Sequence, residues 1–430
     1  MLSSFSRGVS DYKKYVNPYW VAALDDFLEV RNFVSGEGSR LYDEHGNEWL
    51  DLVAGYGSAL LGHNSEVICG KTVLALNKQL VSLQPWGVNL ETAKLAKKLV
   101  QSSPLASSGA KVVFGSSGSE AVEAAIKMAI CHTGRHACVG FNQGFHGLTI
   151  SAMSVAGPSI WNSVLLSKNS KVYESALIEP LLKEQPETWL NRLREGRYAA
   201  VVIELVQGIG GGFRWTEEAL ERLVHACDET GTLIIVDEVQ TGIGRCGEVF
   251  YSSSFADFIP DMIVVSKGLS GGIIPTSAVI VSDLVHHSMF SGDGRAKIHG
   301  STFSGSAIGA NVALAVLEQI ETKGFLARVK RNSSWLKLNL EKLNQNYKAL
   351  ESVDGDGFLI CVKFADQDQT LAAYFVQLFA ENQILVNLAS HRVNTMKITP
   401  AINITRDELQ RFLDVFEALL QYLENEDEVA

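Results

Sequence analysis

The chain has 430 residues, enough for two or three domains and a sizeable core, which excludes a peptide-sized or disulfide-stapled module. Its 37 Lys+Arg against 48 Asp+Glu give a formal net charge of −11, so we expect no nucleic-acid partner bound through a basic face. No apolar run reaches the ~18 residues of a membrane helix and no secretory signal opens the chain, so we expect a cytoplasmic protein without a membrane partner.

The first predicted elements lie before residue 115. Apolar and polar residues alternate over 37–55 around a turn at Gly46, which predicts a small hairpin. Apolar residues then recur at helical spacing over 66–83 and over 90–102. The run 111–114 predicts a short buried strand.

Strands and helices alternate through the middle of the chain. Strands are predicted over 199–203, 233–236 and 262–265, with a helix over 217–229. Continuous β-branched runs separated by helices are typical of strands buried on both faces of a mostly parallel sheet. We therefore expect an α/β fold with a mostly parallel central sheet.

The pattern changes beyond residue 305. Helices are predicted over 306–321, 370–382 and 406–424, with a hairpin-like segment near 352–364. This mixture is typical of a second, smaller α+β domain. The expected domains are an N-terminal segment, 1–65, that is part of the small domain, a large domain, 66–305, and a C-terminal small domain, 306–430.

A glycine and serine turn at 115–119 follows the first strand of the predicted sheet. Ligands of such sheets bind beyond the C-terminal ends of the strands, so residues that follow a strand are the candidates. The turn opens a helix, and its free N–H groups and hydroxyls suit a phosphate. The same pattern also fits an ordinary helix start with a serine N-cap. Because no Gly-Lys-Ser/Thr ends the turn, it is not a Walker A loop.

Charged residues follow the other predicted strands. Asp237 and Glu238 come directly after one strand, where at least one of the two acids must have a partner to be buried, and this partner should be cationic. Lys267 follows the predicted strand 262–265. If its amine is buried, its pKa falls and the neutral amine becomes a nucleophile toward carbonyls. Alternatively, its aliphatic chain packs against apolar residues while the amine reaches water. Glu204 follows the predicted strand 199–203 and precedes the glycine-rich segment 207–212. It could line a pocket at the ends of the strands together with this segment, or it could form a structural salt bridge.

Other motifs are weaker. The literal GxGxxG at 242–247 is not followed by an amphipathic helix, so we do not expect a dinucleotide site. His146 is expected to be a satisfied core or loop histidine, and the ten histidines show no metal spacing. The six cysteines are scattered and predict buried free thiols, so no metal site is expected.

Five short segments, taken together in this order, resemble the class III (ornithine/ω-aminotransferase-like) family of pyridoxal-phosphate enzymes. They are Ser117-Gly118-Ser119-Glu120-Ala121, Phe145-His146-Gly147, Asp237-Glu238-Val239-Gln240-Thr241-Gly242, Ser266-Lys267-Gly268 and His299-Gly300-Ser301-Thr302-Phe303. Each motif is weak alone, but five in this order are specific, and the resemblance spans nearly the whole chain. It implies the fold type I of pyridoxal-phosphate-dependent transferases, pyridoxal 5'-phosphate as cofactor, and a homodimer with shared active sites.

The resemblance also implies residue roles. Lys267 would hold the cofactor as a Schiff base and later move a proton, and Asp237 would keep the pyridine nitrogen protonated. Phe145 and Val239 would enclose the ring, and Gln240 would approach its phenolic oxygen. The remaining implied cofactor-binding residues are Ser117, Gly118, Ser119, His146, Glu204 and, from the neighbouring subunit, Thr302.

The substrate is less determined. Many family members carry an arginine near the C-terminus that binds the substrate α-carboxylate, whereas this chain has Lys397, a point charge without the two-point fork. With Tyr56 and Trp86 near the expected entrance, this favours a larger or less carboxylate-dependent substrate, such as an ω-amine or a biosynthetic intermediate. If Lys397 instead points to solvent or caps the small domain, a different residue such as Arg392 or Arg214 would take the carboxylate.

We therefore expect an aminotransferase that moves an amino group between an amine or amino-acid donor and an aldehyde or keto acceptor by a ping-pong mechanism. An aminomutase, racemase or decarboxylase is the alternative, because the same cofactor site serves all of them. A catalytically silent binding protein is disfavoured, because Lys267 and Asp237 are both present.

Overall fold

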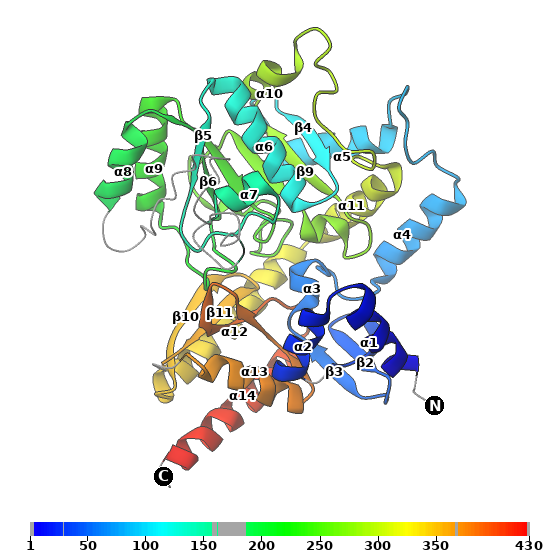
Figure 1. Ribbon diagram of the computed structural model, residues 1–430, viewed down its shortest axis with the longest axis vertical. Coiled ribbons are helices and arrows are strands. Elements are labelled where there is room, and N and C mark those ends of the chain that lie inside the picture. The colour runs from blue at the N-terminus through cyan, green and yellow to red at the C-terminus, as the bar shows by residue number, and fades with distance from the viewer. Residues whose placement is uncertain (1–3, 29, 157–160, 162–185, 366–368, 428–430) are drawn as a thin grey trace.

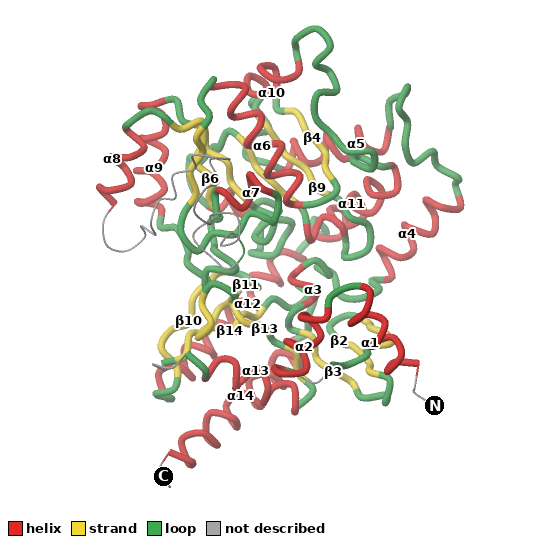
Figure 2. Tube along the Cα trace, viewed as in Figure 1, coloured by secondary structure: helices red, strands yellow, loops and turns green. Residues whose placement is uncertain are grey.

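The computed structural model describes residues 4–28, 30–156, 161, 186–365 and 369–427. Figure 1 shows a large sheet with its helices in the upper half of the molecule and two smaller sheets, with both chain ends, in the lower half. Loops fill much of the region between the two halves (Figure 2). None of the helices in these ranges has the length and apolar content needed to cross a membrane.

The large sheet has six strands in the order β4-β9-β8-β7-β6-β5. They are β4 (Lys111–Gly115), β5 (Ala137–Gly140), β6 (Tyr198–Ile203), β7 (Leu233–Asp237), β8 (Met262–Val265) and β9 (Ser277–Val281). Strands β5 to β8 are parallel, and β9 runs antiparallel to both of its neighbours. Every residue of β6, β7, β8 and β9 is buried. The predicted mostly parallel sheet is therefore confirmed.

Helices cover the large sheet. They are α4 (Glu66–Asn77), α5 (Leu90–Ser102), α6 (Gly118–Thr133), α7 (Ile150–Ser154), α8 (Pro186–Arg194), α9 (Glu217–Thr230), α10 (Asp283–Phe290) and α11 (Ala307–Ile320), with the 3-10 helices η1 (Tyr251–Ser254) and η2 (Lys267–Ser270). Helix α6 begins where the Ser117 hydroxyl accepts the Glu120 N–H and ends at Gly134 in a left-handed conformation. The helix predicted over 90–102 is α5, whereas that predicted over 66–83 ends at Asn77.

The N-terminal segment forms α1 (Ser4–Tyr15), α2 (Pro18–Phe27), β1 (Phe33–Glu37), β2 (Arg40–Asp43), β3 (Glu48–Asp51) and α3 (Ala54–Gly57). The predicted hairpin is confirmed as β2 and β3. Its turn is held by the Asp43 carboxylate, which accepts hydrogen bonds from Asn47 and from the Trp49 indole N–H. Strand β3 pairs with β12 (Ile384–Leu385), which joins this segment to the C-terminal region.

The C-terminal region contains α12 (Phe325–Asn346), β10 (Leu350–Asp356), β11 (Leu359–Phe364), α13 (Leu371–Glu381), β13 (Asn387–Ala389), β14 (Arg392–Ile398) and α14 (Arg406–Asp427). Its antiparallel sheet has the order β10-β11-β14-β13, and the predicted hairpin is β10 and β11. Helix α11 packs against α4 and α5, so the predicted boundary at residue 306 separates a helix from its packing partners. The domain limits stay a prediction.

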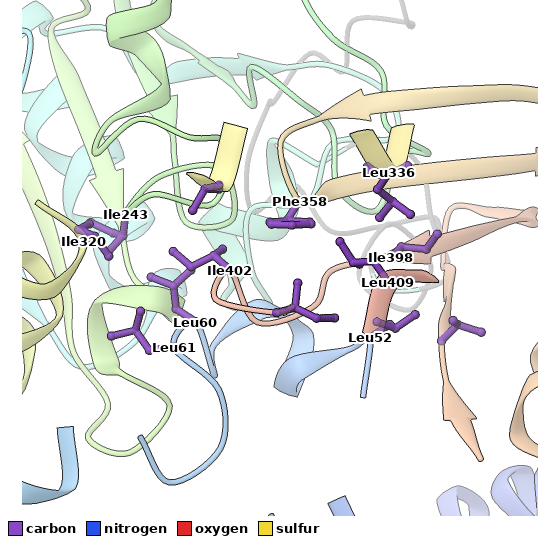
Figure 3. Close-up of a cluster of buried hydrophobic side chains, with 14 of the residues drawn as sticks. Leu52, Leu60, Leu61, Ile243, Ile320, Leu336, Phe358, Ile398, Ile402 and Leu409 are labelled. Atoms are coloured by element: carbon purple, nitrogen blue, oxygen red, sulfur yellow. The ribbon is translucent and has the colours of Figure 1, made fainter. Parts of the chain in front are cut away.

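One apolar cluster crosses the junction between the halves of the molecule. Figure 3 shows Leu60 of the N-terminal segment beside Ile402, and Leu52 of the same segment beside Leu409; Ile243 and Phe358 belong to the same cluster. Each of these side chains is at most 1% exposed. Because the same core supports both halves, the loops between them have a rigid base.

The buried Arg245 also spans this junction. Its guanidinium donates hydrogen bonds to the carbonyl oxygens of Gly57, Phe358 and Pro400. No carboxylate of the described residues lies within ion-pair distance of Arg245, and burial lowers its pKa to about 10. The surrounding stretch 242–247 forms turns and opens no helix, as expected for a coincidental GxGxxG.

The cysteines agree only in part with their prediction. All six are free, and four are buried, but Cys69 is partly exposed and Cys131 is exposed. The prediction of six buried thiols is wrong for these two because they lie on α4 and α6, helices that turn one side to solvent.

Candidate active site

A cavity of about 160 Å³ opens where strands of the large sheet end. Its lining residues are Gly118, Ser119, Phe145, His146, Gly147, Glu204, Asp237, Val239, Gln240, Ser266 and Lys267. Glu204 follows β6, Asp237 ends β7, and Ser266 follows β8. The cavity thus lies at the edge of the sheet where parallel strands place ligands.

All predicted cofactor residues except Ser117 and Thr302 line this cavity. The Ser117 hydroxyl caps α6, and Thr302 is exposed on this single chain. Gly147 and Ser266 also line the cavity and were not predicted as site residues. The sequence could have indicated both residues, because each is the direct neighbour of a predicted site residue.

The three predicted substrate residues do not line the cavity. Tyr56 is 55% exposed and Trp86 is fully exposed, whereas Lys397 is 3% exposed. Lys397 lies on β14 and pairs in register with Cys361 of β11. Burial lowers the pKa of Lys397, and no carboxylate in the described ranges lies within 4 Å of its amine. The alternative that Lys397 points to solvent is therefore wrong.

Asp237 is buried and fully hydrogen-bonded at the end of β7. One carboxylate oxygen accepts the Val239 N–H at 2.9 Å, and the other accepts a hydrogen bond from His146 Nδ1 at 2.8 Å. Burial alone would lower the pKa of His146, but the hydrogen bond and charge of Asp237 and the charge of Glu204 raise it. The predicted partner of Asp237 is thus an imidazole that can carry a positive charge.

The neighbouring Glu238 is satisfied differently. Its carboxylate, 0% exposed, accepts the N–H groups of Tyr251 and Ser252 and the Ser252 hydroxyl. Among the residues that the structure describes, no cation lies within 4 Å of Glu238. Asp237 is therefore the acid with the expected partner, whereas a 3-10 turn supplies three donors to Glu238.

Glu204 lines the cavity and forms no salt bridge with any described residue. Its carboxylate accepts the Phe145 N–H at 3.0 Å and the Gly208 N–H at 3.4 Å. Burial raises the pKa of Glu204 to about 7, and the charge of Asp237 adds to this increase. Of the two readings left open by the sequence, the pocket residue is confirmed.

Lys267 is the first residue of η2, with a left-handed φ of 37°. Burial, and then the positive charge of Lys397, lower the pKa of Lys267 to about 8, while Asp237 and Glu204 oppose this decrease. A positive φ in a lysine is strained and is retained where the surrounding structure imposes it, often at functional sites. Its amine therefore faces the cavity with a reduced preference for the charged form.

The two alternative arginines are engaged elsewhere. Arg214 donates to the Tyr251 hydroxyl and lies 3.6 Å from the Asp356 carboxylate. Arg392 donates from Nε to the Gln143 side chain at 2.9 Å. Arg214 is therefore held away from the cavity, and Arg392 lies beside the loop that carries Phe145.

The cavity residues fit a phosphorylated pyridine ring. The buried Gln240 Nε2 has no hydrogen-bond partner in the structure and can donate to a ligand oxygen. Two glycines keep the cavity open: a Cβ on Gly147 would lie only 2.2 Å from Ser119 Oγ, and one on Gly118 would make a tight contact of 3.2 Å with the Val239 methyl groups. The N–H groups at the start of α6 suit a phosphate.

Comparisons with known proteins agree with this geometry. The family model for aminotransferase class-III matches residues 25–420. Acetylornithine aminotransferase of Vibrio cholerae is 31% identical over 391 residues, 90% of this chain and 91% of that protein. Aminotransferase PigE of Serratia sp. is 31% identical over 370 residues, 84% of this chain and 41% of PigE.

Solved structures share the whole fold. The amine transaminase from an uncultivated Pseudomonas species, in its PLP-bound form, has a TM-score of 0.82 at 25% identity and covers 92% of this chain and 95% of that chain. The predicted fold type I architecture is therefore confirmed.

Proposed function

The chain belongs to the class III aminotransferase family, and from this premise we propose that the cavity lined by Lys267 and Asp237 is its active site. It is a pyridoxal-phosphate-dependent aminotransferase. The observation that carries the assignment of the site is that a buried lysine with a lowered pKa and a buried, oriented aspartate line one cavity.

Bound pyridoxal phosphate supplies an electron-withdrawing ring that stabilises negative charge on a substrate carbon. N–H groups of Gly118 and Ser119 would hold its phosphate, and Phe145 and Val239 would enclose its ring. The free Gln240 Nε2 would donate to its phenolic oxygen. Each role uses a group that lines the cavity.

Two side chains would handle the protons. Asp237 holds a proton at the ring nitrogen, because an anion in a dry site favours the charged form of a neighbouring base. Lys267 would hold the cofactor through Nζ at rest and, with the substrate amine in its place, would move a proton to and from the substrate carbon. In the ping-pong cycle, the first product would leave as an aldehyde or ketone while its amino group stays in the site, and this amino group would then pass to a second, carbonyl substrate.

Borohydride reduction followed by peptide mapping tests this site. We expect the pyridoxyl label on Lys267 and on no other lysine, and no label in Lys267→Ala. Lys397→Ala is the matched control, because it removes the other buried lysine near the cavity. A label on another lysine, with Lys267 unmodified, would overturn the assignment.

A product assay separates aminotransfer from the reactions of the alternative enzymes. With an amine donor and a 2-oxoacid acceptor, we expect an amino acid from the acceptor and an aldehyde or ketone from the donor in equal amounts. Isomerised or decarboxylated donor without consumption of the acceptor would instead identify an aminomutase, racemase or decarboxylase.

For the substrate, the proposal is an ω-amine or biosynthetic intermediate with one negative charge near Lys397. The burial of Lys397 without an ion pair supports this, because a buried cation is stabilised by an anion. Lys397→Ala should lower kcat/KM for an acidic donor by about 1.5–3 kcal/mol, one to two decades, and spare a neutral amine. Lys397→Arg should favour simple α-amino acids. Unchanged ratios in both variants would remove Lys397 from the substrate site.

We also propose a cytoplasmic homodimer with shared sites. Large apolar side chains stay exposed on the single chain near Thr302, among them Phe303 at 68% and, in the segment before α5, Trp86 and Val88. Such side chains are typical of a surface that another chain covers. The six unpaired cysteines support a reducing compartment.

A further inference from the structure

Asp237 is one of three buried polar groups that lie next to one another in the lining of the cavity. Beside it lies His146, which donates from Nδ1 to Asp237 Oδ2 at 2.8 Å. Both side chains are 3% exposed. Since Asp237 Oδ1 already accepts the Val239 N–H, the orientation of this carboxylate is determined from two sides.

Glu204 is the third group. It accepts the Phe145 N–H, one residue before His146, and the Gly208 N–H in the loop after β6. His146 Nε2 and Glu204 Oε2 both border Gly144, at 3.2 and 3.7 Å from the position that a Cβ would take there. Because Gly144 has no side chain, the Glu204 carboxylate and the Nε2 atom of the imidazole can both lie against it, while Nδ1 of the same imidazole bonds to Asp237.

Resting on the proposed function, we propose that His146 and Glu204 are positioning residues that keep Asp237 anionic and aimed at the cofactor's ring nitrogen. His146 supplies the hydrogen bond that orients Asp237. Glu204 holds the loop that carries His146 through its hydrogen bond with the Phe145 N–H. Of the three side chains, Glu204 is the one that gains and loses a proton. When it is protonated, Asp237 is the only anion of the three beside the imidazole.

The surrounding charges fit this division of roles. The groups that face Glu204 and His146 are Asp237 on β7, Lys267 after β8, Lys397 on β14 and His391 before β14. Neither lysine lies within 4 Å of Glu204, so no ion pair in the described chain fixes its charge. Burial raises the pKa of Glu204 to about 7, which allows it to exchange a proton near neutral pH while Asp237 keeps its donors.

The cofactor's visible absorption reports on this group, because the spectrum depends on protons held at and near the ring. We expect the wild-type holoenzyme to show a spectral change with pH that has a midpoint near the pKa of Glu204. Glu204→Gln, which stays neutral, should bind the cofactor and lose this step. Glu204→Asp, which keeps the acid but shortens it, should retain the step with a shifted midpoint. If Glu204→Gln does not fold, Glu204→Asp decides, and an unshifted midpoint there overturns the proposal.

His146 is tested by cofactor dissociation, measured by equilibrium dialysis, alongside turnover. His146→Leu removes the donor and should weaken cofactor binding and lower kcat ten- to a hundredfold, with little change in KM for the amine. His146→Asn returns a donor toward Asp237 and should recover most of both. Wild-type binding and spectrum in His146→Leu would overturn the proposal. A wild-type enzyme whose cofactor is not on Lys267 would instead overturn the proposed function itself.

Discussion

At the scale of single residues, Lys267 and Asp237 have opposite requirements in the same dry cavity. Lys267 must lose its proton to bond to a carbonyl carbon, and burial favours this. The proposed role of Asp237 requires a carboxylate, and the two oxygens of this carboxylate accept hydrogen bonds from His146 and from the Val239 N–H. Burial alone favours the neutral form of both side chains, which suits Lys267 but not Asp237. The hydrogen bonds to Asp237 therefore make the difference between the two groups.

The charge of Asp237 gives the first prediction. Asp237→Asn should fold and bind the cofactor but lose about 3 kcal/mol of transition-state stabilisation, roughly a hundredfold in kcat, because an amide cannot hold the ring nitrogen protonated. Steady-state turnover and the cofactor spectrum check this. Wild-type kcat with a normally bound cofactor would contradict it.

The second prediction concerns pH and Lys267. Since burial and Lys397 lower the Lys267 pKa to about 8, the neutral amine increases as pH rises through 8, and so should the rate at which apoenzyme captures the cofactor aldehyde. Lys397→Met removes a positive charge, raises the Lys267 pKa and should shift this rate profile to higher pH. Lys397→Arg keeps the charge and serves as the control. Stopped-flow absorbance measures both, and an unshifted Lys397→Met profile would refute the coupling.

At the scale of elements, the turn before a helix and the loop facing it define the end of the cavity where we propose that the phosphate binds, the phosphate end. Helix α6 starts at Gly118 behind the Ser117 cap, and Gly147 of the loop after β5 approaches Ser119 so closely that no side chain fits. The phosphate end therefore depends on the contact between these two segments more than on any single donor.

Gly147→Ala tests this contact. Its φ of +121° and a Cβ 2.2 Å from Ser119 Oγ should displace the loop and lower both stability and cofactor affinity. Gly134→Ala, at the C-terminal end of α6, is the matched control: its φ is +69° but nothing lies within 4 Å of its Cβ. It should cost about 1 kcal/mol of stability and leave the cofactor dissociation constant unchanged. Equal affinities in the two variants would argue against the contact.

At the scale of the whole molecule, the proposed shared sites predict complementation between inactive chains. A Lys267→Ala chain mixed with an inactive Thr302 variant should recover about a quarter of wild-type activity after exchange, since half of the dimers are hybrids with one intact site of two. Activity after mixed refolding measures this, with each variant refolded alone as the control. Demonstrated hybrids without activity would count against a shared site.

The local sequence pattern was sufficient to predict the elements whose apolar residues follow a regular spacing. The strands β6, β7 and β8 and the hairpin of β2 and β3 follow from runs and alternation in the chain itself, and five motifs in order identified the family. Even the cavity was predictable in outline, because residues after parallel strands converge at one edge.

Partners across long sequence separations required the tertiary structure. That His146 bonds to Asp237, that a 3-10 turn satisfies Glu238, and that Lys397 is buried without an ion pair cannot be derived from spacing. The N-terminal helices and β9 were also not among the predicted elements. The sequence by itself thus determined which chemistry the site holds, whereas only the packing of distant segments decided the charge and orientation of each group, because desolvation and hydrogen bonding depend on what surrounds a side chain in space.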